Sequence, residues 1–145
     1  NIASFFGDKG ARRFLEYRYG PGSVESLVYD QGQKDREKFT GHILRGADML
    51  DALYQSQDER MADNLRYSPK TSLINEIIAS ADTLNLYQSQ RYLQYLANSK
   101  VNNAFFMSYL RYRADLGIFE QQLEAEFEGD LKKYFLYLRQ QYPSL

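Results

Sequence analysis

The chain has 145 residues, of which 43% are hydrophobic and 15% aromatic. This composition suits one globular domain and excludes a disordered chain, because disordered segments are poor in aromatic residues. The net charge is −1, so we expect no nucleic-acid partner. There is no Cys, which excludes disulfides and thiolate metal sites. No apolar stretch approaches the roughly 20 residues that span a membrane, so we expect no transmembrane segment.

Apolar residues recur at helical spacing along the chain, and no segment alternates as a strand does. We therefore predict an all-α fold of about five to six helices in one helical domain, residues 1–145. The first helix is expected over residues 2–19. Ala3, Gly7 and Gly10 lie near one face of it, where small side chains would let another backbone approach closely. Gly20-Pro21-Gly22 ends this helix, because neither residue type continues one.

A long central helix is predicted from Ser23, which is a good N-cap, to about residue 65. Its apolar stripe runs through residues 39–54, and the alternating charges of residues 34–38 are expected to form a solvated face. The next helix is predicted to begin at Pro69, with Ser68 as its cap. Its buried face is predicted to consist of Leu73, Ile74, Ile77, Ile78 and Ala81.

A Tyr- and Gln-rich helical segment follows residue 84. Two separate helices are then predicted over residues 103–113 and 115–128. Gly129 ends the second of them, and Asp130 caps the last helix. That helix presents apolar residues at i, i+3, i+4 and i+7 spacing, namely Leu131, Tyr134, Phe135 and Leu138.

His42 is the only histidine. A catalytic zinc site usually takes three protein ligands, commonly with at least two histidines, so we expect no metal site within this chain. His42 lies between two core positions and is interpreted as a structural or surface residue. The acidic pairs Glu124–Glu126 and Asp58–Glu59 are interpreted as solvated acids on helix faces, since neither context favours acid–base catalysis. Taken alone, these residues indicate a helical domain and no particular reaction.

Two sets of residues resemble a known family in their order and spacing. The first is Ile-Ala-Ser-Phe-Phe-Gly at residues 2–7, continued by Gly-Ala-Arg-Arg-Phe-Leu at residues 10–15. The second consists of Asn102-Asn103-Ala104, Tyr112, Phe119-Glu120, Gly129-Asp130-Leu131 and Tyr134-Phe135. Together they resemble the C-terminal half of the putative aminopeptidase family of bacterial zinc peptidases.

This resemblance implies a zinc enzyme with a His-Glu-x-x-His helix and a third ligand, the Glu of an Asn-Glu pair that would fall just before Asn1. All zinc ligands would then lie outside the chain, which is expected to be a truncated piece, the C-terminal subdomain of a larger protein. We expect the chain by itself to bind no zinc tightly and to be inactive. Its implied partners are the missing N-terminal catalytic portion and a peptide substrate. A periplasmic or lipoprotein location is implied by the resemblance alone.

The resemblance also suggests site residues. Tyr112 would donate a hydrogen bond to the oxyanion that forms when zinc-bound water attacks a peptide carbonyl. Asn102 or Asn103 would hold the substrate backbone or fix the metal-binding helices. Each has a structural alternative, since the two asparagines can cap a helix and Tyr112 is one of thirteen tyrosines. Family members carry small residues between the Asn pair and the Tyr, whereas this chain has Phe105, Phe106, Met107 and Tyr109.

A different class of function stays open, namely a helical scaffold that binds a protein partner through a Tyr-rich surface. Such a scaffold should present a contiguous aromatic patch. Half of a severed enzyme should instead expose an apolar face beside Ala3 and Gly7. A third alternative, a ligand-binding helical bundle, would need an internal cavity.

Overall fold

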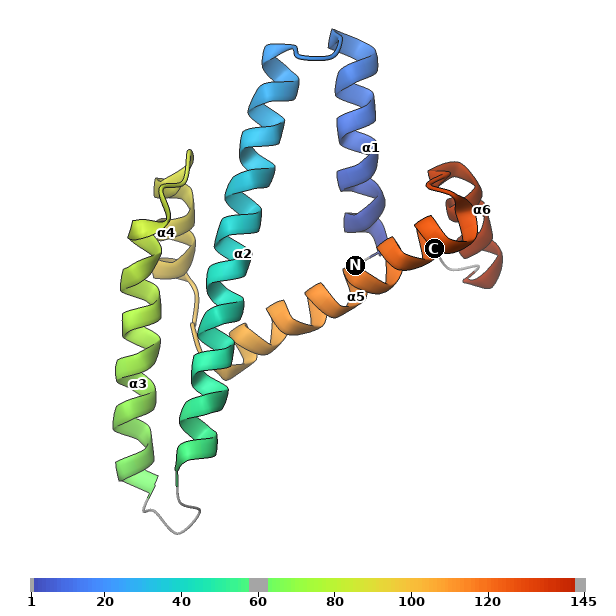
Figure 1. Cartoon of the computed structure of the whole chain (residues 1–145). Helices are drawn as coiled ribbons and strands as arrows, with labels where there is room; N and C mark the ends of the chain where they lie inside the picture. Colours follow the sequence, from blue (N-terminus) through green and yellow to red (C-terminus); the bar gives the residue numbers. More distant parts are fainter. Residues whose placement is uncertain (1, 58–62, 143–145) are drawn as a thin grey trace. The chain divides into compact units, whose positions relative to one another are not determined.

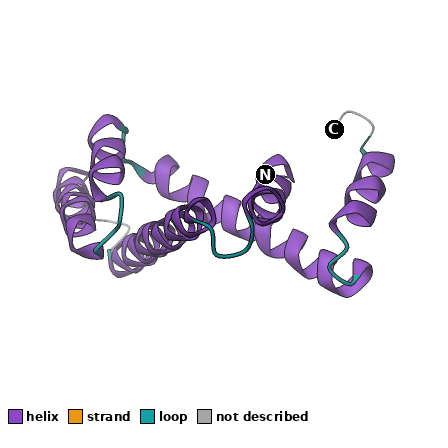
Figure 2. Cartoon of the chain, turned by 90° about the horizontal axis from the view of Figure 1, so that it is seen from above, coloured by secondary structure: helices purple, strands orange, loops and turns teal. Residues whose placement is uncertain are grey.

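The computed structural model describes residues 2–57 and 63–142, and within them every regular element is a helix (Figure 1, Figure 2). In chain order these are α1 (Ile2–Tyr19), α2 (Val24–Ser56), α3 (Asp63–Ser80), the 3-10 helix η1 (Ala81–Leu84), α4 (Ser89–Asn98), α5 (Asn103–Phe127) and α6 (Leu131–Gln141). The predicted all-α class and the long helix are confirmed, since α2 runs for 33 residues. None of these helices is both long and apolar enough to span a membrane.

The chain divides into two compact units. Residues Asn1–Pro21 and Arg111–Leu145 form one, which we call the terminal unit, and residues Gly22–Leu110 form the other, the central unit. The terminal unit contains α1, most of α5, and α6. The central unit contains α2, α3, η1, α4 and the start of α5.

The boundary between α1 and α2 has the predicted chemistry. Gly20 has φ +90° and Gly22 has φ +77°, a left-handed conformation that glycine adopts without the steric cost of a side chain. The Ser23 hydroxyl then accepts a hydrogen bond from the Ser26 N–H at 3.3 Å, which satisfies one of the unpaired donors at the start of α2. The expected stop and the expected cap are therefore both confirmed.

Three predicted helix boundaries are wrong. α2 ends at Ser56 rather than near residue 65, and α3 begins at Asp63, so that Pro69 lies inside the helix. A proline at this position removes one backbone hydrogen bond and crowds the carbonyl four residues earlier, so α3 is held as a helix by the apolar face after Pro69, which packs into the core. α5 runs unbroken where two helices were predicted, because no proline interrupts it and an exposed glycine, Gly117, weakens a helix without ending it.

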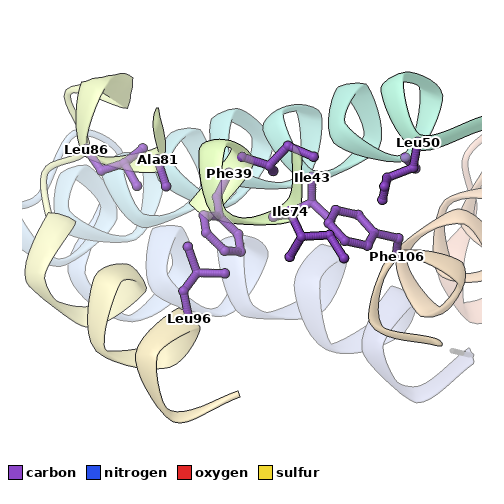
Figure 3. Packing of buried hydrophobic residues seen from close by; sticks show 10 residues of the cluster. Phe39, Ile43, Leu50, Ile74, Ala81, Leu86, Leu96 and Phe106 are labelled. Carbon is purple, nitrogen blue, oxygen red and sulfur yellow. The ribbon is translucent and has the colours of Figure 1, made fainter. Parts of the chain in front are cut away.

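The core of the central unit lies between α2, α3 and the segments that follow α3. Figure 3 shows Phe39 and Ile43 of α2 gathered with Ile74 of α3 and Phe106 of α5. The predicted buried face is confirmed, since its four residues in α3, together with Ala81 at the start of η1, belong to this cluster or pack against it. The buried members of the cluster are Phe39, Ile43, Ala47, Leu50, Ile74, Ile77, Ala81, Leu86, Leu96 and Phe106.

Gly46 marks the tightest approach in this core. A Cβ atom at Gly46 would lie 2.9 Å from Ile77 Cγ2 and 3.1 Å from Phe106 Cε1. Both distances are shorter than ordinary carbon–carbon contacts, which are about 3.5–4.0 Å. The absence of a side chain at Gly46 therefore lets α3 and the start of α5 pack against the middle of α2.

Asp35 joins α2 to the segment before α4. Its side chain is 3% exposed, and its carboxylate accepts hydrogen bonds from the Tyr87 N–H at 2.9 Å and the Gln88 N–H at 2.7 Å. Nearby, the Lys38 ammonium donates to the Asn85 carbonyl at 3.3 Å. The expectation that residues 34–38 form a solvated face is thus correct for Lys34, Arg36, Glu37 and Lys38 but wrong for Asp35.

The terminal unit has a smaller core of its own. Phe5 of α1, Leu123 of α5, and Tyr134 and Leu138 of α6 are buried together. Tyr134 is 0% exposed and donates its hydroxyl hydrogen to Gln122 Oε1 at 2.9 Å, so no buried hydroxyl is left without a partner there. Burial raises the pKa of this tyrosine.

The start of α6 confirms the predicted cap. The Asp130 carboxylate accepts hydrogen bonds from the N–H groups of Lys132 and Lys133, both at 3.0 Å. The bond from the Lys133 N–H is the main reason why the pKa of Asp130 lies below its usual value, because it stabilises the charged form.

Replacing Gly46 by Ala should destabilise the protein. The new Cβ would press on Ile77 and Phe106, and such overpacking costs about 1–3 kcal/mol. The matched control is Gly32→Ala in the same helix, where a Cβ atom would meet nothing within 4 Å. That change should stabilise the protein by about 0.5–1 kcal/mol through helix propensity. Denaturant unfolding measures both free energies, and similar effects of the two substitutions would contradict the packing described here.

Replacing Asp35 by Ala should lower the free energy of unfolding by about 2–4 kcal/mol, because two partly buried backbone N–H groups lose their carboxylate acceptor. Asp35→Asn keeps one carbonyl acceptor and should cost less. Glu37→Ala removes an exposed carboxylate two residues away and should change the free energy by less than about 0.5 kcal/mol. Urea titration of the three variants checks this order, and an Asp35→Ala effect no larger than that of Glu37→Ala would refute it.

Candidate functional site

One face of α1 consists of exposed residues. Ala3, Gly7, Gly10, Phe14 and Tyr17 share this face, because their spacing of four, three, four and three residues keeps them on one side of a helix. We call these five residues the open face of α1. A Cβ atom at Gly7 or Gly10 would meet nothing within 4 Å, and Phe14 and Tyr17 are 60% and 90% exposed.

The opposite side of α1 is the one that its own unit buries. Phe5 is 3% exposed and its ring lies 5.7 Å from that of Phe119 and 6.2 Å from that of Tyr134. Lys9, one turn further along, forms an ion pair with Glu120 at 3.0 Å. Phe5 and Lys9 therefore attach α1 to its own unit on the side away from the open face.

The two asparagines suggested as site residues have different roles at the start of α5. The Asn102 side-chain oxygen accepts a hydrogen bond from the Phe105 N–H at 3.2 Å, so Asn102 caps the helix, which confirms the structural alternative for this residue. The Asn103 side chain is exposed, and its oxygen accepts a hydrogen bond from the Tyr54 hydroxyl at 2.9 Å. Only Asn103 presents its amide at the surface without capping the helix.

Tyr112 lies further along α5 and is partly buried. It belongs to the terminal unit, together with α1, whereas Asn102 and Asn103 belong to the central unit. Neither unit by itself brings the three suggested site residues together. Tyr112 shares its unit with the open face of α1.

The single histidine has a structural contact. His42 is partly buried, and its Nε2–H donates a hydrogen bond to the Ile77 carbonyl at 2.7 Å, which links α2 to α3. This agrees with the interpretation of His42 as a structural residue. Across the described ranges, no group of three or more His, Cys, Asp or Glu residues is placed to hold a metal ion. Glu124 and Glu126 are exposed, as expected, and Asp58–Glu59 lies outside the described residues.

Two tyrosines of the central unit, Tyr92 and Tyr109, pack against its core. The rings of Tyr92 and Tyr109 lie 4.7 Å and 6.3 Å from that of Phe39, and Tyr109 lies 5.2 Å from Phe105. Burial is the main cause that raises the pKa of Tyr92 and of Tyr109, and a hydrogen bond with Tyr95 adds to it at Tyr109. These hydroxyls stay protonated at neutral pH and do not act as bases.

Two contacts of this unit carry no local signal in the sequence. Asp35 belongs to a run of alternating charges, and its backbone partners lie 52 and 53 residues away. Tyr54 ends an apolar helical stripe, and its partner Asn103 lies 49 residues away. Neither pairing could be found from spacing within one helix.

No curated protein and no solved structure matches the chain. The sequence does match the model of the family described as "Putative aminopeptidase", over residues 1–141. This match covers nearly the whole chain and agrees with the resemblance of residues 2–7 and of Asn102-Asn103. The chain therefore belongs to the putative aminopeptidase family.

Proposed function

We propose that this chain is the helical C-terminal part of a zinc-dependent aminopeptidase and that it forms one wall of the substrate cleft. The metal ligands would come from a catalytic portion outside residues 1–145, with the third ligand directly before Asn1. Family membership supports the peptidase activity. Zinc, when bound, would supply the Lewis acid that activates water for attack on the peptide carbonyl.

The open face of α1 is the observation that carries this proposal. A helix that bears a metal ligand must lie close to the helix that bears the two histidines, and small residues permit that approach. Gly7 and Gly10 have free space where a side chain would be. The exposed rings of Phe14 and Tyr17 continue the same face and would add apolar area to the contact. The proposed partner surface is therefore the face of α1 that its own unit leaves uncovered.

The scaffold alternative receives less support from the same residues. A Tyr-rich binding surface needs a contiguous aromatic patch, but Tyr92, Tyr109 and Tyr134 are used in the two cores. The most exposed tyrosines are spread over α1, α3 and the segment before α4, namely Tyr17, Tyr67 and Tyr87.

We propose roles on substrate for Tyr112 and for the two asparagines, each taken by itself, since they belong to different units. Tyr112 would donate its hydroxyl hydrogen to the developing oxyanion. The amide N–H groups of Asn102 or Asn103 would donate to the substrate backbone, because the oxygens of both side chains already accept hydrogen bonds, from the Phe105 N–H and from the Tyr54 hydroxyl.

The sequence encoded immediately before Asn1 tests the proposal directly. We expect an Asn-Glu pair there and a His-Glu-x-x-His motif some way earlier. A longer protein that contains both should bind zinc and release N-terminal residues from peptides. An unrelated linker with no paired histidines would refute the proposal and favour the partner-binding scaffold.

Replacing Gly10 by Leu tests whether the open face of α1 packs against the histidine helix, because the change should leave the folding of residues 1–145 intact. In the chain of residues 1–145 the change should be neutral or stabilising by up to about 1 kcal/mol, since the site is open and Leu favours helix. In the longer protein it should lower zinc retention or activity by about 10–100-fold, because the histidine helix is pushed away. Gly32→Leu, at another open helical glycine, is the control and should leave zinc content unchanged. Full zinc content and activity in Gly10→Leu would contradict the docking surface.

Replacing Tyr112 by Phe tests the oxyanion role in the longer protein. We expect kcat to fall by about 10²–10³-fold with little change in KM, because the hydroxyl would act only in the transition state. Packing should be preserved, so thermal unfolding should shift little. An unchanged kcat would assign Tyr112 a structural role.

A further inference from the structure

Residues 85–98, which include α4, form a short segment between two irregular joints of the central unit. We call this segment the strap. At its start Asn85 has φ +49°, a left-handed conformation that few residues other than glycine and asparagine adopt. After its end Ser99 is extended. Because α4 has only ten residues, and an isolated helix of that length is marginal in water, the strap depends on its contacts with the rest of the unit.

Polar contacts from α2 hold the first part of the strap. The Asp35 carboxylate accepts hydrogen bonds from the N–H groups of Tyr87 and Gln88, at 2.9 Å and 2.7 Å. The Lys38 ammonium donates to the Asn85 carbonyl at 3.3 Å. Gln88 is the N-cap residue of α4, and its own side chain makes no capping bond. Asp35 therefore supplies, from another helix, a charged acceptor for the backbone that leads into α4.

Apolar contacts hold the rest of the strap, and several of them meet at Phe39 of α2. Leu86 and Leu96 belong to the same buried cluster as Phe39 (Figure 3). The rings of Tyr92 and Tyr95 lie 4.7 Å and 6.1 Å from that of Phe39. Phe39 is 2% exposed, so the strap forms part of the cover over this ring.

The contacts between α2, α3 and the start of α5 do not need the strap. Gly46 of α2 lets Ile77 of α3 and Phe106 of α5 approach, since a Cβ atom there would lie 2.9 Å and 3.1 Å from them. The His42 side chain is hydrogen-bonded to the Ile77 carbonyl at 2.7 Å. None of these contacts involves residues 85–98, so they can persist when the strap is lifted.

We infer that the strap opens and closes as one cooperative piece, with the Asp35 carboxylate as its latch, while α2, α3 and the first turns of α5 stay folded. Local opening of this kind occurs where a few contacts hold a short element to a larger core. Opening breaks both hydrogen bonds of Asp35 and uncovers Phe39. The inference does not rest on the proposed peptidase function, and either can fail without the other.

Backbone hydrogen exchange of the whole chain measures this opening. We expect the amides of residues 93–98 to share one opening equilibrium. Relative to their intrinsic rates, they should exchange at least tenfold faster than those of residues 43–50 and 74–78. Equal protection of the three segments would show that the strap unfolds only with the whole unit, and this would overturn the inference.

Two variants separate the opening of the strap from unfolding of the whole unit. Asp35→Asn should speed exchange about tenfold in both the strap and residues 74–78, because the weakened contact is lost in either event. Gly46→Ala should speed exchange about tenfold in residues 74–78 but not in the strap, because its overpacking is the same whether the strap is open or closed. Glu37→Gln removes a charge from an exposed position near Asp35 and should change neither. Equal acceleration of both segments by Gly46→Ala would contradict separate opening.

Lys38→Gln tests the latch even if Asp35→Asn does not fold. It removes the ammonium that donates to the Asn85 carbonyl, so exchange in the strap should speed up about threefold. Lys34→Gln makes the same change of charge at an exposed position one turn earlier on α2 and should have no effect. If Lys38→Gln leaves the exchange of the strap at the rate of Lys34→Gln, the polar contacts with α2 do not hold the strap closed and the inference fails.

Discussion

The Asp35 carboxylate is buried in the central unit. A buried carboxylate is costly unless its oxygens are hydrogen-bonded, and here both oxygens accept backbone N–H groups, from Tyr87 and Gln88. These groups lie just before α4, where the helix dipole also favours a negative charge. The contact holds the segment that follows α3 against the middle of α2. In the helix that follows, α4, the ring of Tyr92 lies 4.7 Å from that of Phe39.

Further contacts of the central unit lie along α2 after Asp35. His42 links α2 to α3 through the Ile77 carbonyl, and one turn later Gly46 leaves room for Ile77 and Phe106. Close packing at these positions makes the start of α5 a fixed platform, because interiors packed at this density tolerate little displacement. Asn103 is the first residue of α5, and its side-chain oxygen accepts a hydrogen bond from the Tyr54 hydroxyl.

In the terminal unit the two sides of α1 differ in their contacts. Phe5 and Lys9 attach the helix to α5 and α6 through a buried aromatic cluster and an ion pair with Glu120. The open face, on the other side, carries the exposed residues Gly7, Gly10, Phe14 and Tyr17. The two units share α5, which carries Asn103 in one and Tyr112 in the other.

The sequence by itself determined the helical class, the stop at Gly20-Pro21-Gly22 and the caps at Ser23 and Asp130, because apolar periodicity and capping are local properties of a chain. It also identified the family, through short motifs at both ends. Only the tertiary structure decided that Asp35 is buried against the backbone of Tyr87 and Gln88 and that Asn103 accepts a hydrogen bond from Tyr54. These contacts join residues about fifty positions apart, and the spacing of residues within one helix holds no information about them.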